Sequence, residues 1–189
     1  MERPAGTRTC LYSPAQLEAV VAAMAARLAP LVAGRPRLGV VGILRRGAPL
    51  ADRLAAALVG LGVAPPLRLD LAIKRYADDL TLLHPDTRFT EQAGQAELDL
   101  AGYTLVVVDD VLYTGHSLLR AVGYLAAKGP AEIRVAVLVD RGVARLPLRA
   151  DVAGLRLDVA PPDVVECNVP PYEADFRIEL LQLERRPAA

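Results

Sequence analysis

The fold is decided by residues 105–117, which read Leu-Val-Val-Val-Asp-Asp-Val-Leu-Tyr-Thr-Gly-His-Ser. The β-branched apolar run that leads into them, Tyr103 to Val108, is typical of a buried parallel strand. Asp109 and Asp110 follow it, and a helix is predicted from about Ser117 to Lys128. Because open α/β folds bind ligands at the carboxyl ends of their strands, this segment predicts both a fold class and a site.

Similar units lie on either side of this segment. The sequence predicts helices at residues 14–33 and 49–61, and strands at residues 38–43, 67–73 and 133–139. Residues 74–100 show no sustained periodicity, as expected of a loop that is either functional or disordered. The alternation of strands and helices predicts an α/β fold with a mostly parallel central sheet flanked by helices.

The residue pattern changes near residue 145, where prolines and a glycine begin to separate short apolar segments. The last piece, Phe176 to Leu183, alternates apolar and charged residues like an edge or hairpin strand. We therefore expect one domain over residues 1–189, with a core at about 13–145 and a small β-rich hood at about 146–185. Only the Arg/Pro/Ala tail is expected to be disordered.

Composition excludes several classes of protein. The 22 basic and 22 acidic residues balance, so no global positive charge indicates a nucleic-acid partner. Two cysteines, Cys10 and Cys167, are too few for a metal site of their own and do not indicate a disulfide framework. The first ten residues lack a hydrophobic signal core, and the apolar stretches are interrupted well before the length of a membrane span. We expect a cytoplasmic protein without membrane contact.

The turn after the central strand has the chemistry of a phosphate site. Gly115 permits the positive φ of a tight turn, and the amides that follow it point from the start of a helix, where an anion is stabilised. Two adjacent carboxylates, Asp109 and Asp110, suit the hydroxyls of a sugar or a metal bound by them. Together these features indicate a sugar 5-phosphate as ligand. The alternative is that the two carboxylates only cap an ordinary strand-to-helix turn.

The segment VVVDDVLYTGHS resembles the phosphoribosyl pyrophosphate (PRPP) signature of type I phosphoribosyltransferases, in the form typical of the PyrR family. Further blocks are similar to the same family: VGILRRGAPLA at residues 41–51, LD at 69–70, DDLT at 78–81, and VLVDRG with LPLRAD between 137 and 151. In order and spacing the resemblance covers about residues 13–160. It implies the type I phosphoribosyltransferase fold and transfer of phosphoribosyl from PRPP to a free base, with Mg²⁺ accompanying PRPP.

The resemblance also assigns roles to individual residues. Asp109 and Asp110 are expected to be the catalytic residues, binding the ribose hydroxyls that also ligate Mg²⁺. Arg45, Arg46 and Gly47 match the pyrophosphate loop, which commonly contains a non-proline cis peptide. Thr114 to Ser117 match the 5-phosphate site. The full substrate-binding set that we expect is Arg45, Arg46, Gly47, Lys74, Arg75, Val111, Leu112, Tyr113, Thr114, Gly115, His116, Ser117, Asp140 and Arg141.

Within that set, Lys74 and Arg75 open a loop that closes over PRPP in such enzymes, with Tyr76 beside them. Asp140 and Arg141 end a strand that presents backbone groups to the base. For Arg45 and Arg46 the alternative is two solvated surface arginines.

Three departures from the family pattern affect what is expected. His116 stands where the family has Arg, so it either binds phosphate with one N–H or points to solvent. Arg45 replaces a Thr of the pyrophosphate loop, and Arg75 and Tyr76 occur in inverted order.

Sites used by RNA-binding members are also altered. The first helix reads VAAMAAR at residues 21–27, Val143 replaces a His, and Leu155-Arg156 replaces Lys-Asn. Since RNA affinity depends on phosphate-neutralising charge, RNA binding is disfavoured.

The sequence therefore supports two functions of different class. The first is an enzyme that makes UMP and pyrophosphate from uracil and PRPP. The second is a regulator of pyrimidine genes that senses PRPP or nucleotides, UMP and UTP among them, with little or no catalysis. No side-chain motif identifies the base, so a purine or a modified pyrimidine stays open. The family forms dimers and tetramers, and a homo-oligomer is expected on that ground.

Overall fold

Two β-sheets of unequal size organise the chain in the computed structural model, which describes residues 6–72, 88–89 and 98–183. The main sheet has six strands in the order β4-β3-β2-β5-β6-β7, and the small sheet has three in the order β1-β9-β8. Within the main sheet β3, β2, β5, β6 and β7 are parallel, and β4 runs antiparallel to β3. The predicted α/β fold with a mostly parallel sheet and a small β-rich hood is confirmed.

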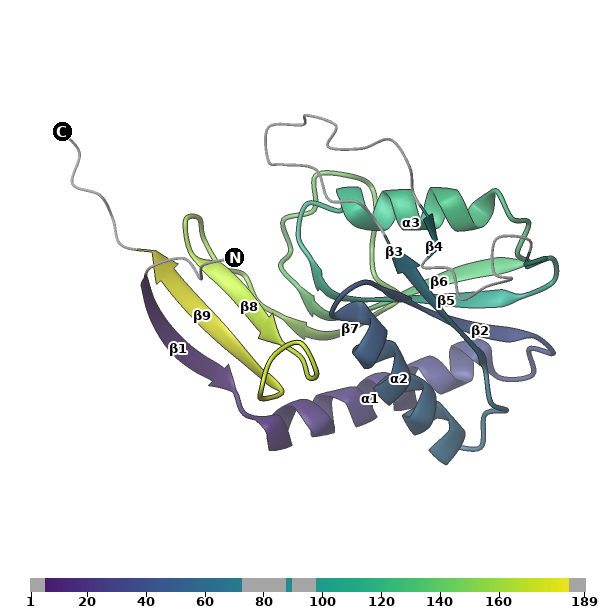
Figure 1. Cartoon of the computed structure of the whole chain (residues 1–189), viewed down its shortest axis with the longest axis horizontal. Coiled ribbons are helices and arrows are strands. Elements are labelled where there is room, and N and C mark those ends of the chain that lie inside the picture. The colour runs from purple at the N-terminus through teal and green to yellow at the C-terminus, as the bar shows by residue number, and fades with distance from the viewer. Residues whose placement is uncertain (1–5, 73–87, 90–97, 184–189) are drawn as a thin grey trace.

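Three helices cover the main sheet (Figure 1), with α3 on one face and α1 and α2 on the other. The helices are α1 (Pro14–Val32), α2 (Gly47–Gly60) and α3 (His116–Ala126). The strands of the main sheet are β2 (Leu38–Ile43), β3 (Leu67–Ala72), β4 (Arg88–Phe89), β5 (Thr104–Leu112), β6 (Glu132–Asp140) and β7 (Val152–Arg156).

Strand β5 lies between β2 and β6 in the middle of the main sheet, and its side chains alternate between two cores. Val106 and Val108 pack with α1 and α2, whereas Leu105 and Val107 pack with α3. Burial on both faces explains why the strand is continuously apolar. It also extends to Leu112 rather than ending at Val108, because Val111 and Leu112 pair with Val139 and Asp140 of β6.

Helix α1 is long and apolar enough to cross a membrane by length and composition alone, so the prediction that every apolar stretch is interrupted well before that length is wrong. Core helices share this property. Here Leu17, Met24 and Leu28 are at most 3% exposed and belong to the core beneath the main sheet. The helix begins with a capping box, in which Gln16 Oε1 accepts the Ser13 N–H at 2.9 Å.

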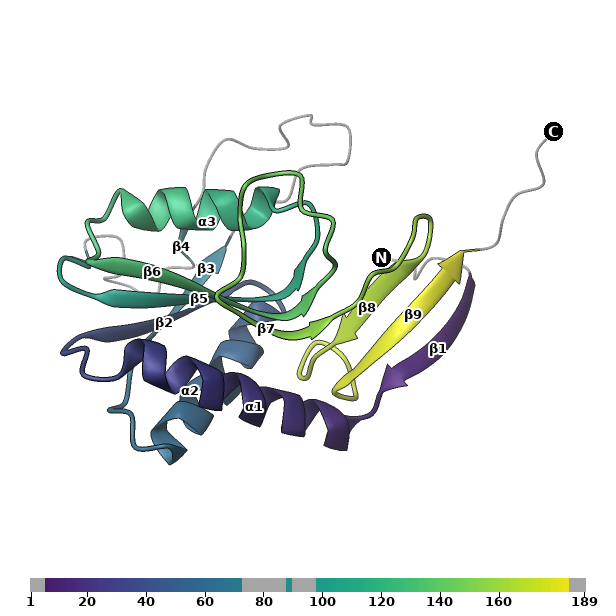
Figure 2. The same ribbon diagram turned by 180° about the vertical axis from the view of Figure 1, so that it is seen from behind.

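The small sheet consists of β1 (Gly6–Tyr12), β8 (Val164–Asn168) and β9 (Arg177–Leu183), and Figure 2 shows it at one end of the main sheet. Its inner face, with Val165, Cys167 and Ile178, joins the same core as α1 and α2. The hood is therefore attached to the main body by apolar packing as well as by the chain.

Two expectations about the hood need correction. The segment 177–183 forms the predicted hairpin with β8 but is the middle strand rather than an edge, because Gly6–Tyr12 pairs along its other side. That strand was not predicted, since its pattern is irregular. The expected hood range of 146–185 also contains β7, which pairs with β6 and so belongs to the main sheet.

Candidate functional site

Asp109 and Asp110 lie near the carboxyl end of β5 and are both buried, at 8% and 6% exposed. Asp110 lies toward the turn between β2 and α2, since its Oδ2 is 3.8 Å from Arg46 Nη1. Each carboxylate accepts the next backbone amide: Asp109 Oδ1 from the Asp110 N–H at 2.9 Å, and Asp110 Oδ1 from the Val111 N–H at 3.0 Å. These two bonds hold both carboxylates in a fixed orientation at the end of the strand.

The turn that follows has the geometry predicted for a phosphate site. Gly115 has φ +90° and is the N-cap of α3, so the first helical amides point out of the turn. A Cβ on Gly115 would meet only ordinary contacts near 3.7 Å, so the glycine is required for its φ rather than for space. The Thr114 carbonyl accepts the Arg145 N–H at 3.1 Å, which fixes the turn against the chain after β6.

His116 is the first residue of α3 and is exposed. Its Nδ1 lies 3.0 Å from Thr114 Oγ1, so the ring stays beside the turn. The ring is exposed, as one alternative expects, and it also contacts the Thr114 hydroxyl; phosphate binding by His116 stays a prediction. Of the neighbouring predicted residues, Tyr113 is 44% exposed and Ser117 is half-buried, whereas Leu112 belongs to the core and contributes only its backbone.

Arg45, Arg46 and Gly47 form the turn between β2 and α2, and the Leu44–Arg45 peptide bond is cis, as the family resemblance implies. The turn lies directly against β5 at the carboxylates. A Cβ on Gly47 would come within 2.5 Å of the Val108 carbonyl oxygen and 3.2 Å of Asp109 Cα. Glycine is thus required at 47 so that the arginine turn and the carboxylates can share one edge of the sheet.

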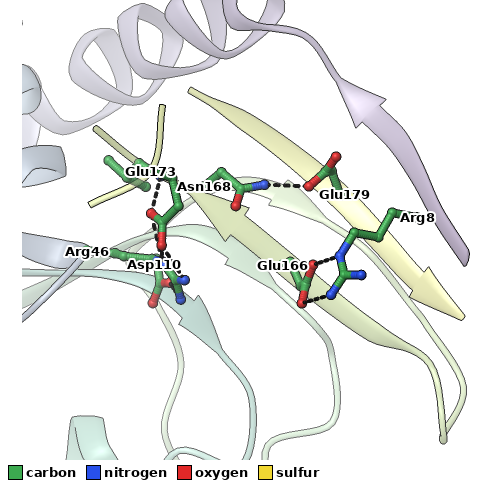
Figure 3. A network of polar contacts seen from close by, with 8 residues as sticks. Arg8, Arg46, Asp110, Glu166, Asn168, Glu173 and Glu179 are labelled. Carbon is green, nitrogen blue, oxygen red and sulfur yellow. Dashed lines mark hydrogen bonds and ion pairs between the residues drawn. The ribbon is translucent and has the colours of Figure 1, made fainter. Parts of the chain in front are cut away.

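The Arg46 guanidinium connects the two sheets, as Figure 3 shows. Its Nη2 donates to Glu173 Oε1 at 2.6 Å, while its Nη1 lies 3.8 Å from Asp110 Oδ2. The hydrogen bond to Glu173 raises the pKa of Arg46; burial opposes the shift and the charge of Asp110 adds to it. Arg46 is therefore a fixed cation at the acidic edge, not a solvated surface arginine.

Arg141 follows the end of β6 and is 5% exposed. Its guanidinium lies over the Tyr113 ring, 4.8 Å from the centroid, and Nη2 donates to the Val159 carbonyl at 2.6 Å. The Arg141 N–H donates to the Leu112 carbonyl, and the Asp140 carbonyl accepts from Leu157. These two backbone groups, expected to face a base, are engaged inside the protein, and the Arg141 side chain links the phosphate turn to the hood.

Not every expected residue is brought together. Lys74, Arg75 and Tyr76 lie outside the described residues. Conversely, Glu173 and Tyr172 of the loop between β8 and β9 contact the arginine turn and were not predicted. No local motif surrounds them, and the contact joins positions 127 residues apart, so the sequence carried no signal for it. In the described part of the chain no group of three His, Cys, Asp or Glu could hold a metal by itself.

A buried pair of carboxylates, a glycine turn at a helix N-terminus and an anchored arginine lie together at one edge of the main sheet. The model of the phosphoribosyl transferase domain family matches residues 10–175. The chain therefore belongs to the phosphoribosyltransferase family.

Within that family the chain is PyrR-like. It is 40% identical over 153 residues to the bifunctional protein PyrR of Deinococcus deserti, covering 80% of this chain and 82% of that protein. The PyrR of Thermus thermophilus is 39% identical over 155 residues, with 80% and 83% covered.

Solved structures agree on the type I fold. A Trypanosoma cruzi hypoxanthine phosphoribosyltransferase superposes with a TM-score of 0.76 at 19% identity, covering 96% of this chain and 95% of that one. The same enzyme in complex with its product IMP gives 0.72 at 17% identity, with 96% and 94% covered. At this identity the agreement concerns the fold, so the base that this chain uses is a separate question.

Proposed function

We propose that this protein transfers the phosphoribosyl group of PRPP to uracil, giving UMP and pyrophosphate. The observation that carries the proposal is the meeting of Asp109, Asp110 and the Gly115 turn with Arg46 at one edge of the main sheet. These groups match, in order, the ribose hydroxyls, the 5-phosphate and the pyrophosphate of PRPP.

The reaction forms a bond between a ring nitrogen of the base and C1 of the ribose, while the bond from C1 to the pyrophosphate oxygen breaks. The base loses its nitrogen proton and pyrophosphate leaves with the bonding pair. Positive charge develops on the sugar, and the buried Asp110 carboxylate stabilises it electrostatically. Arg46 neutralises charge on the leaving pyrophosphate, and the Gly115 turn holds the 5-phosphate in place.

Magnesium fits the donors at this edge, because Mg²⁺ prefers oxygen ligands and is commonly shared between carboxylates and substrate phosphates. Asp109 and Asp110 would hold it through the ribose hydroxyls that they bind, and the ion would neutralise pyrophosphate charge. Two carboxylates without a third donor in the described residues suit a metal that arrives with its substrate.

Uracil is the proposed base because the relatives of high coverage are PyrR proteins. The test is a screen of free bases with PRPP, in which uracil should be converted and Asp110→Asn should convert it far more slowly. PRPP binding without turnover of any base would overturn the enzyme and favour the second candidate, a PRPP- or nucleotide-sensing regulator. Conversion of hypoxanthine or guanine instead would overturn the proposed base alone.

RNA binding is not part of the proposal. Of the cations nearest the positions that RNA-binding members use, Arg27 donates to the Ala153 carbonyl at 2.7 Å, and Arg156 forms an exposed ion pair with Asp158 at 3.6 Å. Val143, 40% exposed, offers no charge. A filter-binding assay should show no uridine-nucleotide-dependent RNA affinity.

We also propose that the protein acts in the cytoplasm as a homodimer or homotetramer, as its resemblance to the PyrR family implies. Light scattering of the purified chain should give two or four times the monomer mass. A monomer that is fully active would contradict the oligomer.

A further inference from the structure

The loop between β8 and β9 holds both arginines of the pyrophosphate turn. Glu173 binds Arg46, and Tyr172 places its ring 5.4 Å from the guanidinium carbon of Arg45. Two consecutive hood residues therefore contact two consecutive arginines of the turn between β2 and α2. A single ion pair between two surfaces is common. Here two adjacent contacts fix the loop between β8 and β9 against the turn between β2 and α2.

Glu173 is itself held in place. Its side chain is 11% exposed, and its Oε2 accepts the Val169 N–H at 2.9 Å. The loop around it is closed by a backbone bond from the Tyr172 N–H to the Val169 carbonyl at 3.1 Å. The carboxylate thus offers a fixed edge, which is what orients a planar guanidinium.

Glu173 binds only one edge of the Arg46 guanidinium, the edge that carries Nε and Nη2. Glu173 accepts from Nε at 3.1 Å and from Nη2 at 2.6 Å, so Nη1 is directed toward Asp110. A guanidinium has five N–H donors, and the Nη1 donors are beyond hydrogen-bond length from Asp110, at 3.8 Å. Those donors face the acidic edge where a diphosphate would arrive.

From this geometry we infer that Glu173 is a positioning residue for pyrophosphate, which anchors the rear edge of Arg46 so that Nη1 is directed into the site. The inference rests on the proposed function. Without the anchor, Arg46 regains rotational freedom, and Asp110 becomes its nearest strong anion. Arg46 would then close onto the carboxylate that the sugar needs. The hood thereby determines the affinity for the leaving group.

An opposite role for Glu173 makes the reverse prediction. If Glu173 competed with pyrophosphate for Arg46, removing its charge would lower the KM for PRPP. For a positioning residue, Glu173→Gln should raise the KM for PRPP and the dissociation constant of magnesium pyrophosphate by about tenfold, the loss of one charge-assisted hydrogen bond.

The matched control is Glu166→Gln, which breaks a similar two-bond pair with Arg8 in the same small sheet, at 2.8 and 3.2 Å. It should leave both constants unchanged while costing comparable thermal stability. Arg46→Gln combined with Glu173→Gln should show no additional loss over Arg46→Gln, since Glu173 acts through Arg46.

The outcomes separate the two proposals. Unchanged or lower constants in Glu173→Gln, in a wild type that binds PRPP, overturn the positioning role alone, as do additive losses in the double variant. A wild type that does not bind PRPP overturns the proposed function, and the positioning role with it. Pyrophosphate binding by calorimetry does not require turnover, so it decides the point even if no base reacts.

Discussion

The two sheets contribute to the site in different ways. The main sheet supplies Asp109, Asp110 and the Gly115 turn from one contiguous segment, whereas the small sheet supplies Glu173 through an ion pair between positions 127 residues apart. In the proposed function, the contiguous part carries the groups for the sugar and its phosphate, and the distant part orients the cation for the leaving group. The comparison shows that the carboxylates and the glycine turn come from neighbouring residues in the sequence. The orientation of the arginine depends instead on packing between distant segments.

The comparison is tested most strongly at the main sheet. Asp110→Asn removes the negative charge beside the developing sugar cation and should lower kcat/KM by about 100- to 1000-fold. The measurement is the initial rate of UMP formation at saturating uracil. Asp52→Asn is the control, because Asp52 is an exposed carboxylate of α2 that pairs with Arg68 of β3. Equal losses in both variants would contradict a special role for the buried carboxylate.

The next largest effect is expected from disturbing the contact between β5 and the turn of Arg45, Arg46 and Gly47. Gly47→Ala places a methyl group 2.5 Å from the Val108 carbonyl oxygen, so backbone must move, at a cost of about 1–3 kcal/mol in the free energy of unfolding. The displaced turn should also lower kcat/KM. Urea denaturation measures the first effect.

Gly123→Ala gives the opposite sign and serves as its control. Gly123 is an exposed helical glycine in α3 with open space around it, so alanine should stabilise the protein by about 1 kcal/mol. If both alanines stabilise the protein, Gly47 is not held against β5.

A smaller effect is expected at the phosphate turn. His116→Arg restores the fork of donors at the start of α3 and should lower the KM for PRPP by about two- to fivefold, in line with a charge near a helix N-terminus. His116→Gln, which lacks a charge, should raise it or leave it unchanged. Steady-state kinetics at varied PRPP measures both. A rise in KM with arginine would mean that the ring is needed where it lies beside Thr114.

The smallest expected effect concerns the reactivity of the two cysteines of the small sheet, Cys10 and Cys167. Burial, followed by the charge of Asp110, raises the pKa of the Cys167 thiol well above its usual range, while Cys10 is exposed. Iodoacetamide at pH 8 should therefore label one thiol per native chain and two in guanidinium chloride. Native labelling of Cys167 would show that the small sheet opens readily.

The raised pKa of Cys167 also makes the stability of the protein depend on pH. The Cys167 pKa is raised in the folded state, so its contribution is present below the unfolded value of about 8.5 and is lost as pH rises above it. The urea midpoint of unfolding should be lower at pH 10 than at pH 8. Cys167→Ala should reduce this difference.

Much of the fold could be predicted because its signals are local. The β-branched run before Asp109 and the glycine turn before α3 predicted strand, site and helix from neighbouring residues. The small sheet was harder, because β1 has an irregular pattern and is ordered by pairing with β9. Glu173 could not be predicted at all, since its role depends on where a hairpin loop packs.

The most direct test of the central claim is the stoichiometry of the reaction with PRPP and uracil in the presence of Mg²⁺. Uracil consumed, UMP formed and pyrophosphate released should be equal in amount throughout the time course. Pyrophosphate released without UMP, or PRPP bound without turnover, would contradict the assignment of this sheet edge as a phosphoribosyl transfer site.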